Sequence, residues 1–159
     1  MGEYKTAQIC QNGHVITADI FFEELCSKYC PKCGETTITN CPICSEPIRG
    51  RYQNCEGFFS RKYRAPAYCH NCGKPFPWTK LKLEAARELI NDVDELTDEE
   101  RKNINNSFTN IISDNPMTTV SANKIRNVLK KIPEQATSCL RDILVDIASE
   151  TAKKIIWPS

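Results

Sequence analysis

The sequence of 159 residues lacks any hydrophobic run approaching the roughly 20 residues that a membrane-spanning helix needs. Its N-terminal segment also lacks the apolar core of a secretory signal peptide. We therefore expect a cytoplasmic protein that does not enter a membrane. Disulfides rarely persist in a reducing compartment, so the ten cysteines of the chain need another explanation.

The chain also lacks a strong charge of either sign and the motifs of common zinc enzymes. Its formal net charge is +1, whereas a dedicated nucleic-acid-binding domain is usually far more basic. It contains no H-E-x-x-H motif and no deaminase pattern of H-x-E with P-C-x-x-C. No Cys-x-x-Cys opens a helix in a βαβ unit, as it does in thioredoxin-like redox proteins. These absences favour a protein without catalysis of its own, and we predict no catalytic residue and no organic cofactor.

Nine of the ten cysteines lie before residue 73, and most belong to four short elements with metal-ligand spacing. In sequence order the elements are Cys10-Gln-Asn-Gly-His14, Cys30-Pro-Lys-Cys33, Cys41-Pro-Ile-Cys44 and Cys69-His-Asn-Cys72. A Cys-x-x-Cys turn directs two thiolates at one point, and a tetrahedral zinc ion needs two such pairs. Glycine directly after the second cysteine, as at Gly34 and Gly73, suits the positive φ at which the turn closes. The pattern predicts two zinc ions with eight ligands: Cys10, His14, Cys30, Cys33, Cys41, Cys44, Cys69 and Cys72.

The order of the four elements favours one way of pairing them, although two others use the same residues. In sequential pairing the first two elements form one site, and the last two form the other. A cross-braced arrangement stays open, as does a short ribbon that joins the second element to the third. Cys26 and Cys55 are left over, and we expect packing residues or free thiols, with a ligand exchange for either left open. Four good ligands close each site, which favours structural zinc over catalytic zinc with an open position.

Secondary-structure signals change near residue 78. Before it, β-branched residues at 15–17 and 36–39 predict short strands. After it, apolar residues recur with the 3.6-residue period of amphipathic helices. The sequence thus predicts an α+β protein, with a tandem zinc-ribbon domain of short β-hairpins at 1–78 and a four-helix bundle-like domain at 79–159.

Four apolar stripes mark the predicted helices of the second domain. The first helix begins at Lys80 with Thr79 as its cap, and the second follows the capping box Thr97-Asp-Glu-Glu100. The third helix has Val120 on its apolar face. The fourth is long, begins at Pro133 and has Cys139 as a packing residue in or beside its apolar stripe.

These elements carry a resemblance to known zinc proteins. Cys10-x-x-Gly-His14 with Tyr29-Cys30-Pro-Lys-Cys33-Gly resembles the front half of bacterial double zinc ribbons. Cys41-Pro-Ile-Cys44 with Pro47-Ile-Arg-Gly50, followed by Pro66-Ala-Tyr-Cys69-His-Asn-Cys72-Gly-Lys-Pro-Phe-Pro-Trp78, is similar to an uncharacterised bacterial family with a zinc-ribbon front and a helical rear. The resemblance covers residues 8 to 90 well and the remainder loosely. It implies the same eight ligands and a cytosolic bacterial protein, and it implies no activity.

Three functions are compatible with this sequence. Closed metal sites and balanced charge favour a zinc-stabilised adaptor that binds another protein. The alternative is a nucleic-acid-binding regulator, because basic residues between the third and fourth elements alternate with aromatics, as in surfaces that contact phosphates and stack bases: Arg49, Arg51, Arg61, Lys62 and Arg64. The favoured interpretation of this stretch is that its aromatics fill the thin core of a ribbon and its arginines solvate the rim.

The third candidate is an enzyme or stress effector that uses His70 or an acidic face of the bundle. The apolar end, Ile155-Ile156-Trp157, is expected to fold back onto the bundle, with docking on a partner as the alternative. The sequence predicts no oligomeric state.

Overall fold

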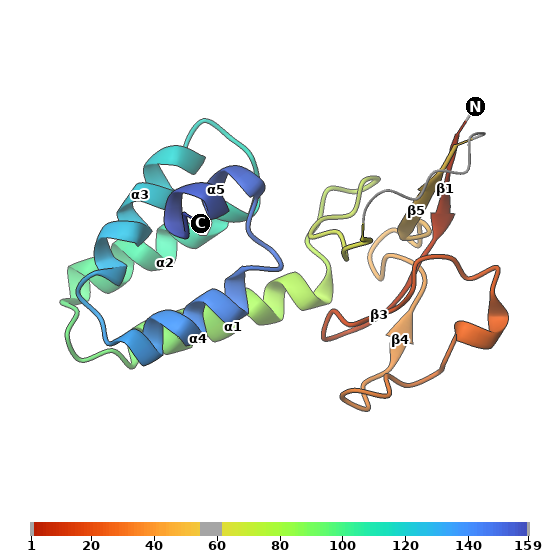
Figure 1. Ribbon diagram of the computed structural model, residues 1–159, viewed down its shortest axis with the longest axis horizontal. Coiled ribbons are helices and arrows are strands. Elements are labelled where there is room, and N and C mark those ends of the chain that lie inside the picture. The colour runs from red at the N-terminus through yellow and green to blue at the C-terminus, as the bar shows by residue number, and fades with distance from the viewer. Residues whose placement is uncertain (1, 55–61, 159) are drawn as a thin grey trace. The chain divides into compact units, whose positions relative to one another are not determined.

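The computed structural model describes residues 2–54 and 62–158 (Figure 1). Contacts within the chain divide it into two compact units, Met1–Lys80 and Leu81–Ser159, called here the N-terminal and C-terminal units. The first contains small antiparallel sheets, and the second is helical, so the predicted α+β class is confirmed. The predicted domains, residues 1–78 and 79–159, stay a prediction.

The strands of the N-terminal unit form two small sheets. Strand β1 (Glu3–Thr6) pairs antiparallel with β5 (Arg49–Gln53). The other sheet has the order β3-β2-β4, in which β2 (Gln8–Cys10) lies between β3 (Val15–Thr17) and β4 (Thr37–Ile38). The two strands predicted from β-branched residues are confirmed as β3 and β4.

A small apolar core lies within this unit and includes two cysteines. Ala7, Ile9, Ile48, Phe76 and Trp78 are almost fully buried and cluster with Cys41 and Cys69. The rings of Phe76 and Trp78 stack with centroids 4.7 Å apart. The Trp78 indole N–H donates to the carbonyl oxygen of Pro66 at 2.9 Å. The aromatic residues therefore hold the segment that leads to the last cysteine turn.

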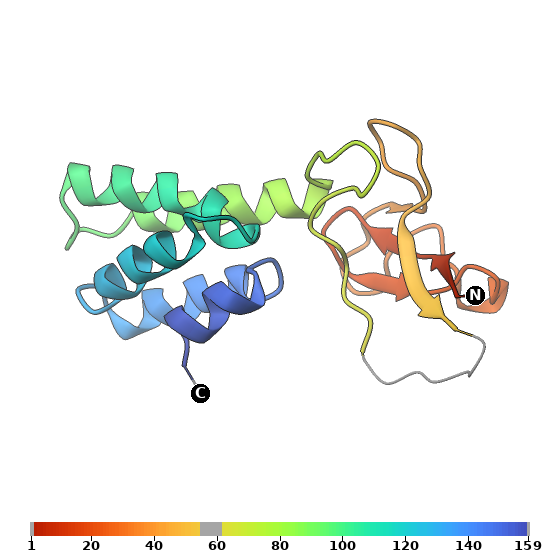
Figure 2. The same cartoon turned by 90° about the horizontal axis from the view of Figure 1, so that it is seen from above.

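Five α-helices follow in the described part of the chain: α1 (Pro77–Asn91), α2 (Asp98–Ile112), α3 (Thr118–Leu129), α4 (Glu134–Leu144) and α5 (Glu150–Ile156). Within the C-terminal unit, α3 packs against both α2 and α5; Figure 2 shows α1 and α2 on one side of this unit and α4 and α5 on the other. The buried hydrophobic residues of this unit are aliphatic apart from Phe108. Among the described residues, no helix combines the length and apolarity needed to cross a membrane.

The capping box at the start of α2 is confirmed. The Glu100 N–H donates to the Thr97 hydroxyl, and the Thr97 N–H donates to the Glu100 carboxylate. The apolar end of the chain folds back as expected, because Ile156 in α5 is buried.

Other helix predictions need correction. The first helix begins at Pro77, so Thr79 lies inside α1, where its hydroxyl donates to the carbonyl oxygen of Ala67 at 2.8 Å. The long last helix is two helices, because Ser149 starts α5 as a cap that accepts from the Ala152 N–H. Val120 is exposed, since Thr118, Ala122 and Ile125 form the buried face of α3.

Candidate metal centres

Three of the four predicted elements fold into the same backbone turn. In each turn, the N–H of the first cysteine donates to the carbonyl oxygen of the residue five positions later. The N–H of the residue after the second cysteine donates to the carbonyl oxygen of the first cysteine. In the Cys30 turn both N···O distances are 2.8 Å, from Cys30 to Glu35 and from Gly34 to Cys30. The turns that begin at Cys41 and Cys69 repeat this pattern at 2.8 and 2.9 Å. Three copies of one turn thus present three pairs of thiols.

The residue after the second cysteine closes each turn with positive φ. The angle is 75° at Gly34, 73° at Gly73 and 65° at Ser45. Ser45 is the only non-glycine residue with positive φ in the described part of the chain, and this conformation costs an L-residue about 1–2 kcal/mol. The side-chain amide of Asn40 donates to the Ser45 carbonyl oxygen at 2.8 Å, which helps to hold the turn.

The first element is instead the turn of the β2–β3 hairpin. Cys10 donates its N–H to the His14 carbonyl oxygen at 2.9 Å, and Gly13 donates to that of Cys10 at 2.8 Å. Gly13 has φ of 95°, and a Cβ there would lie 2.9 Å from the Cβ of Trp78. The turn therefore requires glycine, both for its backbone angle and for close packing against Trp78.

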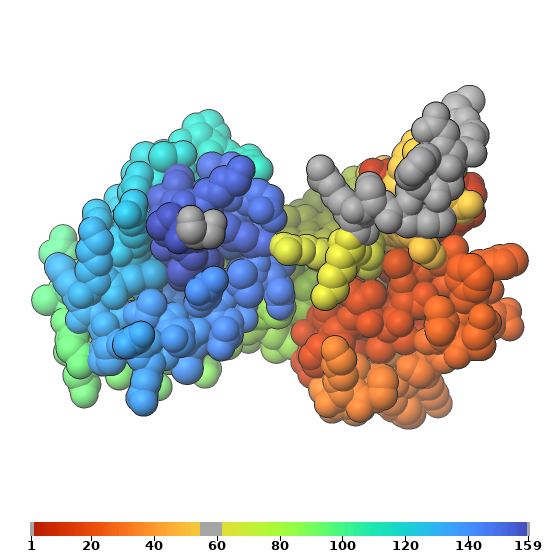
Figure 3. Space-filling view, in the orientation of Figure 1, coloured from red at the N-terminus to blue at the C-terminus, as the bar shows by residue number. Residues whose placement is uncertain are grey.

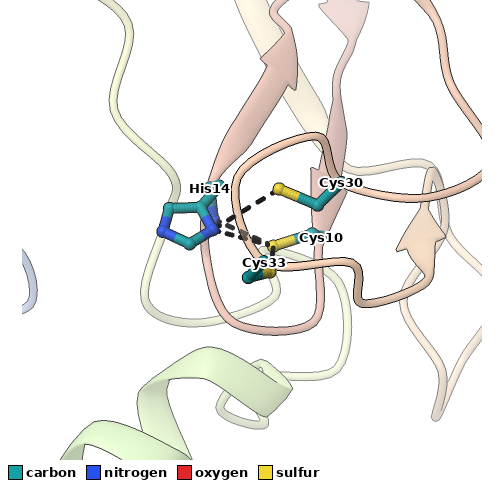
Figure 4. A group of neighbouring side chains, drawn as sticks. All are labelled: Cys10, His14, Cys30 and Cys33. Atoms are coloured by element: carbon teal, nitrogen blue, oxygen red, sulfur yellow. Dashed lines mark hydrogen bonds between the residues drawn. The ribbon is translucent and has the colours of Figure 1, made fainter.

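Cys10, His14, Cys30 and Cys33 converge on one point, here called cluster 1 (Figure 4). The sulfurs of Cys10 and Cys33 are 3.8 Å apart. His14 presents Nδ1, which lies 3.4 Å from the Cys10 sulfur and 3.5 Å from the Cys30 sulfur. Ligands of one tetrahedral zinc ion are separated by about 3.8 Å between two sulfurs and about 3.5 Å between sulfur and nitrogen. These four donors lie at the spacing that one tetrahedral metal ion would impose.

Cys41, Cys44, Cys69 and Cys72 form cluster 2. The sulfurs of Cys41 and Cys72 are 3.7 Å apart, and those of Cys44 and Cys69 are 3.6 Å apart. Each contact joins a thiol of one turn to a thiol of the other. In both clusters all ligand atoms lie within 4.8 Å of one another, so the structure brings the elements together in sequential order.

Backbone and amide groups donate to the sulfurs around both clusters. The Asn12 side chain donates to the Cys33 sulfur at 3.4 Å, and the His14 N–H donates to the Cys10 sulfur at 3.3 Å. In cluster 2 the Asn71 N–H donates to the Cys69 sulfur at 3.4 Å. Such outer donors orient metal ligands and stabilise the thiolate form.

The surroundings favour the thiolate at one cysteine of each cluster. The backbone N–H of Glu35, together with the Asn12 side chain, lowers the pKa of the Cys33 thiol to about 6. The side chain of Asn71 and the backbone N–H of Glu46 lower the pKa of Cys44 to about 6 as well. Thiolates are the form that binds metal, so these surroundings favour the metal-binding form of Cys33 and of Cys44.

Two other thiols hold their protons more firmly in the metal-free protein. Burial raises the pKa of the Cys10 thiol. The backbone N–H of Lys74 lowers the pKa of Cys72, but burial and the neighbouring thiols outweigh it and raise the value to about 11. A metal ion would have to displace these protons, as is usual when cysteine ligates a metal.

The remaining cysteines lie outside the two clusters. Cys26 is half-buried and borders a hollow of about 280 Å³ that His14 and Cys30 also line. Cys139 is exposed on α4, so the expectation that it packs is wrong, because α4 buries Leu140 and Leu144 instead. Cys55 lies outside the described residues.

The basic residues of the nucleic-acid hypothesis fall into different surroundings. Arg49 is exposed on β5, and Lys62 and Arg64 are exposed in the segment that precedes the last turn, whereas Arg51 is half-buried. Arg61 lies outside the described residues. His70, the residue of the enzyme hypothesis, lies 3.6 Å from a carboxylate oxygen of Glu46, with which it forms an ion pair when protonated.

Sequence reasoning missed several residues that shape the clusters. Asn12 and Asn71 lie inside the ligand motifs, and their positions could have pointed to donors for the sulfurs. Trp78 could have been noted as a large aromatic directly after the last turn. Its contact with the hairpin turn at Gly13 has no local sequence signal.

Comparison with known protein families assigns the chain to one of them. The model of the family described as "Uncharacterized protein conserved in bacteria (DUF2321)" matches residues 3–156. The chain belongs to the DUF2321 family. The resemblance to an uncharacterised bacterial family is thereby confirmed, and it extends over nearly the whole DUF2321 chain. No curated protein and no solved structure matches the sequence.

Proposed function

We propose that this DUF2321 protein is a zinc-stabilised adaptor: two structural zinc ions hold the N-terminal unit, which binds another protein and catalyses no reaction. Thiolate and imidazole donors at tetrahedral spacing suit zinc. Four protein donors fill each coordination sphere, which leaves no position for a water or a substrate. The turns lie beside short antiparallel strands, as in zinc ribbons, and a reducing cytoplasm would keep the thiols available.

The observation that carries the adaptor proposal is the Phe21 loop, defined as residues 19–26 between β3 and the Cys30 turn. Phe21 is 81% exposed, and Leu25 is 55% exposed. Phe22, also exposed, meets Phe21 edge-on with ring centroids 5.7 Å apart. Figure 3 shows this segment, in orange, on the outer surface of the N-terminal unit. Contiguous exposed apolar side chains are typical of protein-binding sites.

The backbone under these side chains is held in place. Asp19 is buried, and its carboxylate accepts from the Phe21 N–H at 3.0 Å. The Ile20 N–H donates to the Thr6 carbonyl oxygen at 2.9 Å, which ties the loop to β1. A fixed loop loses little conformational entropy on binding, so the exposed apolar residues are preorganised for a partner.

The charges of the loop indicate what kind of partner fits. Glu23 and Glu24 form the short 3-10 helix η1 (Glu23–Leu25), and both are exposed beside the apolar residues. Opposite charges across an interface speed association and select partners. The loop therefore suits a protein with an apolar pocket whose rim carries lysine or arginine.

Metal analysis of the purified protein tests the zinc part of the proposal. We expect two zinc ions per chain, both removed by a strong chelator with loss of structure in the N-terminal unit. A single zinc, a different metal, or a chain that keeps its N-terminal structure without metal would contradict it.

Photo-crosslinking in the native cell tests the adaptor part. A photoreactive residue at position 21 should give one protein adduct, and the double variant Glu23→Lys, Glu24→Lys should abolish it. Ile43 is the matched control, since it is 56% exposed in the same unit but lies in the Cys41 turn. The crosslinked peptide of the partner should carry apolar residues flanked by lysine or arginine. No adduct at 21, or equal adducts at 21 and 43, would refute the Phe21 loop as the docking site.

A further inference from the structure

We infer that the β1–β5 sheet is a binding surface for single-stranded nucleic acid, formed by Tyr4, Tyr52 and Arg49 with Lys62 and Arg64 beside them. This inference goes beyond the adaptor proposal, because it uses residues outside the Phe21 loop. The sheet offers a matching group for both parts of a nucleotide. An aromatic ring can stack on the base, and a positive charge can bind the phosphate.

The two tyrosines lie opposite each other on paired strands. Tyr4 of β1 pairs with Tyr52 of β5, and their ring centroids are 5.0 Å apart with an interplanar angle of 61°. Tyr4 is 51% exposed and Tyr52 is 49% exposed. An edge-on contact covers one face of one ring only, and both rings stay about half exposed, so ring surface remains on which a planar base can stack.

Arg49 adds a positive charge to the same surface. Its guanidinium carbon lies 4.4 Å from the centroid of the Tyr4 ring, a cation–π contact. A guanidinium stacked on a ring keeps N–H donors in its own plane, and these could bind a phosphate that follows a stacked base. The nearby acid, Glu3, is neutralised by an ion pair with Lys5.

A hydrogen bond brings two further cations to this sheet. The Tyr63 hydroxyl donates to the carbonyl oxygen of Arg49 at 2.6 Å, and Tyr63 packs against the apolar core of the unit. Lys62 and Arg64, on either side of Tyr63, are exposed. The Tyr63 hydrogen bond thus places two further exposed basic residues in the segment that adjoins β5.

Single strands fit this surface better than a duplex. Bases inside a duplex are stacked on each other, whereas an unpaired base can stack on an exposed aromatic ring, with arginine and lysine along the backbone. Tyrosine and arginine also occur at protein hot spots. In the described strands β1 and β5, the single acidic residue is Glu3, and it pairs with Lys5. The surface therefore suits a polyanion better than a protein.

The test measures fluorescence anisotropy of labelled oligonucleotides with the zinc-loaded full chain. The probes are oligothymidine and oligouridine of about 12 nucleotides, a length within the range of single-strand site sizes, and a duplex of the same length. We expect both single strands to bind at low salt and more weakly as salt rises. The ratio of the two affinities shows whether the surface prefers single-stranded DNA or single-stranded RNA. The duplex should bind more weakly than the tighter-binding single strand.

The variants separate stacking from charge. Tyr52→Ala and Tyr4→Ala should each weaken binding about tenfold, the usual loss of one stacked base. Arg49→Ala should weaken binding and reduce the slope of log affinity against log salt by about 0.7, the loss of one phosphate contact. The matched control is Tyr29→Ala, because Tyr29 is 53% exposed and has the Lys28 ammonium 5.6 Å from its ring.

Several outcomes would overturn the inference: no binding of either single strand at low salt, tighter binding of the duplex, or an equal loss for Tyr29→Ala and Tyr52→Ala. Zinc content identifies any variant that has lost its fold. Should the alanine variants lose zinc, ultraviolet crosslinking of wild-type protein to 5-iodouracil oligonucleotides replaces them. Adducts on Tyr4 or Tyr52 support the surface, and adducts confined to other residues refute it. None of these results depends on whether the Phe21 loop binds a protein.

Discussion

Clusters 1 and 2 share the same donor spacing but lie in different surroundings. In cluster 2, Cys41 and Cys69 are part of the apolar core, packed with Ile48, Phe76 and Trp78. In cluster 1, Cys10 and Cys30 are buried as well but lie outside this core, Cys33 is exposed, and the cluster lies at the turn of the β2–β3 hairpin. Cluster 2 therefore replaces part of a hydrophobic core, whereas cluster 1 fastens the hairpin to the Cys30 turn. One metal chemistry thus has two structural roles, and this difference can be tested.

The largest effect is expected from removing one ligand of cluster 2. Cys69→Ser should lose its metal and unfold the N-terminal unit, because the binding free energy of structural zinc is also folding free energy, about 10–16 kcal/mol in zinc-finger peptides. Cys33→Ser should lose one metal ion and keep the core around Trp78. Zinc content and amide chemical-shift dispersion measure both variants. Equal unfolding by the two substitutions would show that the clusters do not differ in this way.

Acid should empty the two clusters in order. The pKa values of Cys33 and Cys44 lie at about 6, below the ordinary thiol value of 9.0. A lowered pKa stabilises the folded state above the unfolded value, and this contribution is lost as pH falls through the folded value. This contribution belongs to the metal-free protein, and bound zinc competes with protons for the same sulfurs. We therefore expect zinc release only below about pH 6, first from cluster 1, where Cys33 is exposed to solvent.

A chromogenic chelator follows this release during a pH titration. Two phases are expected, and Cys33→Ser should remove only the phase at higher pH. The contrary result is a single phase in which the wild-type protein releases both ions and Cys33→Ser releases its remaining ion at the same pH. It would mean that the clusters respond to acid as one unit.

Trp78 connects the two clusters, so its removal should weaken both. Its side chain packs on the hairpin turn of cluster 1 at Gly13 and in the core that contains Cys41 and Cys69. Trp78→Ala should lower the free energy of unfolding by about 3–5 kcal/mol. Leu81→Ala is the control in the same helix, because Leu81 is 47% exposed and should change stability by less than about 0.5 kcal/mol. Similar losses in urea denaturation for the two variants would argue against the shared core.

The smallest effect concerns the three equivalent turns. Ser45→Gly should stabilise the protein by about 1 kcal/mol, because glycine adopts positive φ without the penalty of an L-residue. The converse change, Gly34→Ala, should destabilise by a similar amount, since a Cβ at Gly34 meets no atom within 4 Å and only the backbone angle opposes it. Thermal denaturation of the zinc-loaded protein measures both. A loss of stability in Ser45→Gly would mean that the serine side chain has a role in the turn.

The candidate ligands could be predicted from the sequence because their chemistry is local. A Cys-x-x-Cys turn closes within a few residues, and its spacing is visible along the chain. Ser45 could not be predicted in the same way, because serine does not signal positive φ as Gly34 and Gly73 do. The turn adopts the angle at Ser45 because its two backbone hydrogen bonds impose it.

The fold could be predicted at the level of class and less well in detail. The apolar pattern after Pro133 continues without a visible break, but the chain leaves α4 so that Ile147 and Ala148 become buried. The Ser149 N–H then donates to the Ile111 carbonyl oxygen at 2.8 Å, a contact with α2. Tertiary contacts of this kind override a periodic pattern, and they also create the pairing of Tyr4 with Tyr52, which no local signal marks.

The position of Trp78 provides an intrinsic optical probe. The chain contains two tryptophans, Trp78 in the N-terminal unit and Trp157 in the C-terminal unit. With Trp157→Phe, emission would come from Trp78 alone, whose ring stacks on Phe76 within the core that contains two cluster 2 cysteines. Its wavelength and quenching should then report metal loading of the N-terminal unit in real time, without any label.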